Sequence, residues 1–256
     1  MRRSILFLLT TPLLFISHSM AVVTHEFGHS FMAWMLGIKS NPLIITWGDT
    51  SALNILTLFQ IGERVDYARA IGGGHNLAAA LTAATGPFFV NGGLYAYFRI
   101  NARLRSKSQH PGLRLMYFWL LFMNLANLYD YVPIRTFSPT GDIANICAAL
   151  HISPWRIYIF IFPIVIEGIM NFYKYQIPGL CADLGLDPFD RKFLLLVSSF
   201  LMFGYYGSVG FRAIDPVSNF LAGSSILSLP FVIILYWSRS MTSRDHPHQI
   251  LGSANG

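Results

Sequence analysis

Long apolar runs separated by short polar segments make up most of this chain. The runs that are long enough to cross a bilayer, for which a helix needs about 20 residues, lie at 4–37, 74–98, 113–134, 154–174, 191–211 and 217–238. The first run is too long for one crossing, because a helix of its length would reach roughly 50 Å across an apolar core of about 30 Å. We therefore expect Pro12 to kink this helix or to start it.

The segments between the runs differ in character. Residues 39–70 are mixed, and "NPLIITWG" and "LNILTLFQI", divided by "GDTS", predict short strands at the membrane face. Residues 175–190 predict a loop, and 241–256 a disordered polar tail. The sequence thus predicts an all-α integral membrane protein of about six transmembrane helices. A small strand-containing insertion follows the first span, and residues 1–240 form a single domain.

Composition agrees with a membrane protein. Hydrophobic residues make up 54% of the 256 residues and charged residues only 12%, against about a quarter charged in soluble domains. Cys147 and Cys181 form neither a disulfide framework nor a zinc-finger spacing. The sequence has no glycine-rich phosphate loop, basic helix or RNA-binding aromatic motif, so nucleic acid is not an expected partner.

The net charge of +6 is explained by membrane topology. With a cytoplasmic N-terminus and six spans, the cytoplasmic segments hold most of the basic residues: Arg2, Arg3, Arg99, Arg103, Arg105, Lys107, Arg114, Lys174, Arg191, Lys192, Arg239 and Arg244. Lysine and arginine favour the cytoplasmic side, which predicts that both termini lie there. Size and charge pattern favour a bacterial inner membrane.

The N-terminus also resembles a secretory signal peptide, with a basic start, an apolar centre and small residues near Ala21. The apolar run continues past Ala21, however. Cleavage there would also leave the histidines of the next motif at a frayed end. We therefore expect this segment to be retained.

The first run contains His25-Glu26-Phe27-Gly28-His29, an H-E-x-x-H motif. Helix residues four apart share a face and lie about 6 Å apart along the axis, so two imidazoles can bind one zinc ion. Glu26 is then placed to accept a proton from a water whose pKa zinc lowers to roughly 7. Ionisable groups within spans are costly, which favours a zinc site over a pair of hydrogen-bonded histidines.

Catalytic zinc needs a third protein ligand and an open position. "NLYDYVPIRTFSPTGDIANI", residues 127–146, offers two carboxylates. Asp142 is the preferred candidate, although it also fits an ordinary helix N-cap. Asp130, at the end of its span, is the rival. Of the other ionisable residues, His18 is expected off the face of His25 as a packing residue.

On these residues the chain resembles the site-2 protease family of intramembrane zinc metalloproteases. "HEFGH" matches the family's zinc-binding helix, and its second motif corresponds in order to Asn127, Pro133, Pro139 and Asp142. Here the spacing from Asn127 to Asp142 is longer, and glycine precedes the aspartate instead of following it. "ATGPFFVNGGL", residues 84–94, is similar to a segment on the family's intervening helix.

The resemblance covers residues 20–146 and implies zinc-dependent hydrolysis of membrane-anchored proteins within or near the bilayer. The residues it implies are the zinc ligands His25, His29 and Asp142, the base Glu26, and Asn127 as an amide that orients substrate or stabilises developing charge. Asn127 has a second interpretation as a polar contact between helices. Two other functions stay open: a catalytically idle relative that binds membrane proteins, and a metal transporter or sensor.

Overall fold

A computed structural model describes residues 3–101 and 110–237, so the predicted tail at 241–256 lies outside the described residues. The α-helices are α1 (Arg3–Met35), α2 (Ala52–Thr57), α3 (Tyr67–Gly72), α4 (Asn76–Ala84), α5 (Gly93–Ile100), α7 (Pro111–Tyr129), α8 (Asp142–Leu150), α9 (Pro154–Asn171), α10 (Ile177–Leu184), α11 (Pro188–Ser199) and α12 (Pro216–Trp237). Wider π-turns are η1 (Thr85–Gly92), η2 (Asp130–Ile134), η3 (Phe172–Gln176) and η4 (Phe200–Tyr206), and η5 (Val209–Arg212) is a 3-10 turn.

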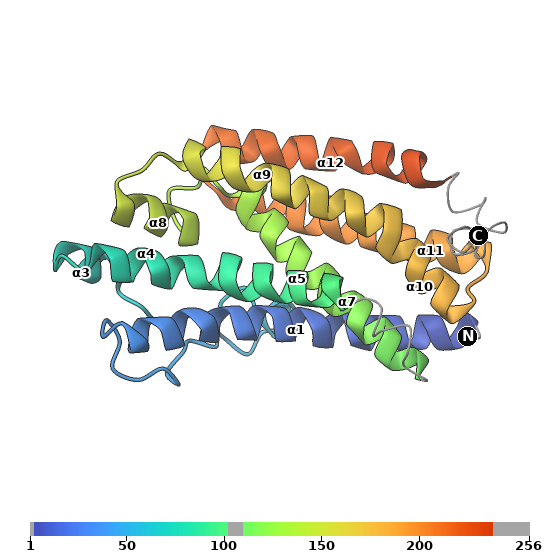
Figure 1. Cartoon of the computed structure of the whole chain (residues 1–256), viewed down its shortest axis with the longest axis horizontal. Helices are drawn as coiled ribbons and strands as arrows, with labels where there is room; N and C mark the ends of the chain where they lie inside the picture. Colours follow the sequence, from blue (N-terminus) through green and yellow to red (C-terminus); the bar gives the residue numbers. More distant parts are fainter. Residues whose placement is uncertain (1–2, 102–109, 238–256) are drawn as a thin grey trace, which may run out of the picture.

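Five helical stretches are long and apolar enough to cross a membrane. They are Leu6–Met35, Asn76–Ile100, Pro154–Leu184, Pro188–Arg212 and Pro216–Trp237. The chain therefore has the helices of a multi-pass membrane protein, as the apolar runs predict. The start of α1 and the end of α12 lie at the same end of the molecule (Figure 1).

The predicted span at 113–134 forms α7 and η2 but is not among these five stretches. α7 crosses the middle of the bundle (Figure 1), and every residue from Phe118 to Tyr129 is buried. Its neighbours are α1, α5, η1, α9, α10 and η4. A helix enclosed by other helices does not need an apolar surface toward lipid, so α7 can carry Asn124 and Asn127.

The predicted strand insertion is wrong for the described residues. Residues 39–66 form a loop with a single antiparallel bridge, in which Thr46 and Gly62 exchange backbone hydrogen bonds of 2.7 and 3.0 Å. Much of the second predicted strand is the helix α2, which begins after the N-cap Ser51. The buried Asn54 side chain bonds to Trp47 O at 2.9 Å and Asp49 O at 2.7 Å, satisfying carbonyls that a sheet would otherwise pair.

The loop predicted at 175–190 is also wrong, since these residues include α10 and the start of α11. Gly185 ends α10 with φ +59, a left-handed conformation that favours glycine.

Small residues set the position of α8. Ala79, Ala80 and Ala83 are buried on α4 where α8 packs against it, and Ile143 and Ile146 belong to the same apolar cluster. Alanine side chains let two helix backbones approach closely. This packing brings the first residue of α8 toward α1.

Candidate metal centre

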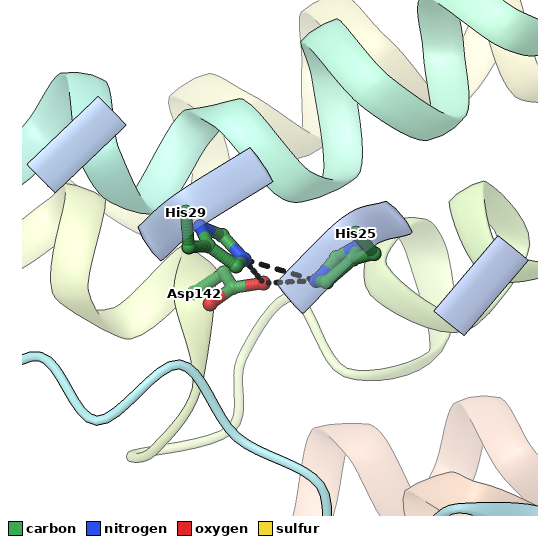
Figure 2. A group of neighbouring side chains, drawn as sticks. All are labelled: His25, His29 and Asp142. Carbon is green, nitrogen blue, oxygen red and sulfur yellow. Dashed lines mark hydrogen bonds and ion pairs between the residues drawn. The ribbon is translucent and has the colours of Figure 1, made fainter. Parts of the chain in front are cut away.

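His25 and His29 come from one face of α1, and both are buried. Their Nε2 atoms lie 3.0 Å apart and point to a common position (Figure 2). α1 therefore presents the two imidazoles as the i and i+4 spacing predicts. α1 is one unbroken helix from Arg3 to Met35 despite Pro12, so the predicted start at Pro12 is wrong.

Asp142 is the first residue of α8, and its carboxylate reaches the same position (Figure 2). Its Oδ2 lies 3.1 Å from His25 Nε2 and 3.2 Å from His29 Nε2. Gly141 precedes it with φ +99, a left-handed conformation that glycine adopts without strain. The three residues form a group whose ligand atoms all lie within 4.8 Å of one another.

The outer nitrogen of each imidazole faces an acceptor. His25 Nδ1 lies 2.5 Å from Asn91 Oδ1, and His29 Nδ1 lies 2.6 Å from Thr82 O. Because an amide or carbonyl oxygen only accepts, each Nδ1 is the donor and carries the proton. Both Nε2 atoms then keep a lone pair directed at Asp142, which is the tautomer of a metal-binding histidine.

Gly86, at the start of η1, keeps the space next to the two histidines free of side-chain atoms. A Cβ atom there would lie 2.2 Å from His29 Nε2 and 2.5 Å from His25 Nε2. Gly28 has a related role in packing, since a Cβ would lie 2.5 Å from Val90 Cγ2. The close approach of α1 to η1 thus depends on two glycines that lack side chains.

Asp130 does not join the histidines. Its Oδ1 accepts a 2.8 Å hydrogen bond from Arg135 Nε, and its Oδ2 pairs with Arg135 Nη2. This two-bond pair neutralises the carboxylate within η2 and the turn that follows it. The structure therefore brings Asp142, and not Asp130, to the two histidines.

Sequence reasoning missed Tyr131. Its ring stacks on His25 at a centroid distance of 5.1 Å, and its hydroxyl lies 3.0 Å from His25 Nε2. The Arg135 guanidinium covers the ring of Tyr131 at 4.6 Å. Tyr131 lies within η2, the π-helical turn that follows α7, where the α-helical period no longer predicts the direction of a side chain.

Glu63 and Tyr67 were missed as well, because their segment was assigned to a sheet. The carboxyl group of Glu63 lies near that of Glu26. Glu26 Oε2 is buried and accepts no hydrogen bond from the described residues. Burial raises the pKa of the Tyr67 hydroxyl, and the nearby carboxylates of Glu63 and Asp142 raise this pKa further. Tyr67 thus stays protonated, and its hydroxyl, which has no hydrogen-bond partner among the described residues, is available as a donor beside the site.

A cavity of about 220 Å³ adjoins His25 and Glu26, and Asn127 lines it. The side-chain nitrogen of Asn127 donates a hydrogen bond to Met123 O at 2.8 Å, and the side-chain oxygen takes no part in this bond. His18 lines the same cavity, bonding to Tyr206 Oη and Thr57 O at 2.9 Å each. The expectation that His18 lies off the face of His25 is wrong, since seven residues are close to two full helical turns.

Glu167, on α9, is paired with Arg99 of α5 through bonds of 2.5 and 2.6 Å, and it does not belong to the group of His25, His29 and Asp142. The pair ties two membrane-spanning stretches together and accounts for a carboxylate within a span.

No protein-family model, curated protein or solved structure matches this chain. Fold and site together define a helical, multi-pass membrane protein with a buried His-His-Asp group whose atoms lie close enough to hold a metal ion.

Proposed function

We propose that the protein is an intramembrane zinc metallopeptidase that hydrolyses peptide bonds of membrane-anchored proteins. One observation carries the proposal: His25 Nε2, His29 Nε2 and Asp142 Oδ2 converge at 3.0–3.2 Å. When both imidazoles are neutral and carry their proton on Nδ1, these three atoms are all acceptors and repel one another unless a cation lies among them. Zinc takes imidazole nitrogen and carboxylate oxygen, and three protein ligands leave one position open.

The surroundings fit this ion. Asn91 and Thr82 hold the imidazoles in the required tautomer. Gly86 keeps side-chain atoms out of the space that the ion needs. The cavity beside His25 and Glu26 gives water and a peptide a route to the site.

Bound zinc would supply a Lewis acid and a water of lowered pKa. Glu26, with Oε2 unpaired among the described residues, accepts the proton of the attacking water and delivers it to the leaving amine. The Tyr131 hydroxyl, on the cavity side of His25, donates to the carbonyl oxygen as negative charge develops. Asn127, farther along the cavity wall, orients the peptide.

The proposal includes a membrane arrangement. α7 is a sixth crossing, both termini are cytoplasmic, and the membrane is the inner membrane of a bacterium. The support is the position of the start of α1 and the end of α12 at one end of the bundle (Figure 1). The excess of lysine and arginine in the segments expected to be cytoplasmic supports the orientation.

The decisive test combines zinc content with cleavage, using detergent-purified protein and single-span test proteins co-reconstituted in liposomes. We expect wild type to hold one zinc per chain and to generate new N-termini by mass spectrometry. Glu26→Gln should keep zinc and lose cleavage, whereas Asp142→Ala should lose both. Asp130→Asn, an isosteric control, should keep zinc because Asp130 is engaged by Arg135.

Absence of zinc from metal-replete wild type would overturn the proposal. Zinc binding without cleavage of any test protein would also contradict it, and would favour a catalytically idle relative that binds membrane proteins.

A further inference from the structure

The cavity beside the candidate metal centre has two parts of different chemistry. The part next to His25 and Glu26, of about 220 Å³, also contains the guanidinium groups of Arg135 and Arg212. A neighbouring apolar hollow of about 270 Å³ is lined by side chains that include Phe15 and Leu201. His18, Thr57, Tyr205 and Tyr206 line both, so that the two hollows are adjacent.

The two arginines of the polar part differ in their charge balance. Arg135 is held by the Asp130 carboxylate through two bonds and lies over the Tyr131 ring. Asp130 is thereby neutralised as well, and Glu26 lies at the metal end of the cavity. Arg212 also acts electrostatically on the Asp130 carboxylate. Because both oxygens of that carboxylate are engaged by Arg135, Arg212 forms no ion pair with any of the described residues.

Arg212 ends the turn η5 and is exposed. It lies over the Phe59 ring at 5.9 Å, and no hydrogen bond or ion pair joins it to residues 3–101 or 110–237. The nearest acid in sequence, Asp215, accepts from Ser218 N at 2.7 Å and caps α12. A guanidinium presents a planar fork of donors that matches the two oxygens of a carboxylate.

We infer that this cavity binds a carboxylate of the substrate, and that Arg212 is the residue that selects it. The inference rests on the proposed function, because it assigns the substrate that the metal centre would cleave. The apolar hollow accommodates hydrophobic residues of the same substrate. The carboxylate is an acidic side chain near the cleaved bond or the C-terminal carboxylate, and the same guanidinium geometry suits both.

Binding of defined peptides tests this without any cleavage. The probes are apolar peptides of about 20 residues with an uncharged fluorophore, measured by anisotropy in neutral detergent micelles with chelator-treated protein. One arm compares an internal Asp with Asn in peptides that have an amidated C-terminus. The other compares a free C-terminal carboxylate with its amide in peptides that lack acidic residues.

Wild type should bind the carboxylate form in one of the arms about 10-fold more tightly, as expected for a charge-assisted pair. Arg212→Gln should reduce the preference to less than about 2-fold and leave the neutral peptide unaffected. Arg212→Lys, which keeps the charge but loses the fork, should be intermediate. Arg156→Gln is the matched control, since Arg156 is exposed on α9 and does not line the cavity.

The arm that shows the preference identifies the carboxylate as side chain or C-terminus. Equal affinities in both arms would overturn the inference, as would a preference that survives in Arg212→Gln. Because metal is removed, the readout is separate from proteolysis. Zinc binding and cleavage with no carboxylate preference contradict this inference alone, and a preference without zinc or cleavage contradicts only the proposed function.

Discussion

At the scale of the residue, the geometry of the site requires that position 86 have no side chain. A Cβ atom at this position would lie within 2.5 Å of the Nε2 atoms of both histidines. We expect Gly86→Ala to lower zinc affinity by about 100-fold or more, since it displaces ligands rather than their outer partners. Competitive zinc titration in detergent measures the change.

Gly93, seven residues further along the same helical stretch, is the control for that substitution. A Cβ there meets nothing within 4 Å, so Gly93→Ala should retain wild-type zinc affinity. Wild-type affinity in Gly86→Ala would show that the metal does not lie between the two Nε2 atoms.

Tyr131 lines the cavity next to His25. Its hydroxyl lies 3.0 Å from His25 Nε2. Tyr131→Phe should lower kcat by roughly 100-fold, the usual cost of one donor to a developing oxyanion, while zinc content stays at one per chain. Tyr158→Phe, on α9, is the matched control. A kcat unchanged by Tyr131→Phe would assign the hydroxyl to packing.

The candidate metal ligands were predictable from the sequence to different extents. Four-residue spacing alone places His25 and His29 together. The sequence favours Asp142 but leaves Asp130 as a rival, and Arg135 decides between them by pairing with Asp130 across a π-turn. No periodic rule describes that turn, so Tyr131 could not be predicted as a neighbour of His25.

At the scale of the element, Lys39 fastens the 39–66 loop to the end of α1. Its Nζ donates to Ser30 Oγ at 2.6 Å, to Ile44 O at 2.7 Å and to Glu63 O. Lys39→Met should make the amides of Thr46 and Gly62 exchange roughly 10- to 100-fold faster, as these bonds are lost. Hydrogen exchange followed by mass spectrometry measures this.

Arg69→Met serves as the comparison, because Arg69 is a nearby exposed base on α3 that does not hold the loop. Equal protection of Thr46 in wild type and Lys39→Met would mean that the bridge alone stabilises the loop.

The long helices were predictable because apolar runs of bilayer length have few other outcomes. The 39–66 loop was not, because short apolar stretches suit a strand and a half-buried loop equally. There the outcome depends on individual side chains, of which Asn54 is the clearest example, since it bonds to two carbonyls of the loop. The sequence shows Asn54 but not its partners.

At the scale of the whole molecule, the number of crossings determines where the ends lie. The five apolar stretches alone would place the ends on opposite sides, whereas α7 as a further crossing places them on the same side. We expect reporter fusions at the two ends to indicate the cytoplasm in both cases. A fusion after Thr140, in the loop before α8, should indicate the opposite side, and ends on opposite sides would exclude α7 as a crossing.

The enclosed position of α7 has a consequence for biosynthesis. Translocons release segments into lipid in the order of synthesis, and they disfavour polar and charged residues. α7 contains Arg114, Asn124 and Asn127, and it leaves the ribosome after α1 and α5 but before α9, α10 and η4, which also pack on it. Membrane insertion of α7 should therefore be completed only when the later helices arrive, so that a nascent chain shortened before α9 would be a substrate for quality control.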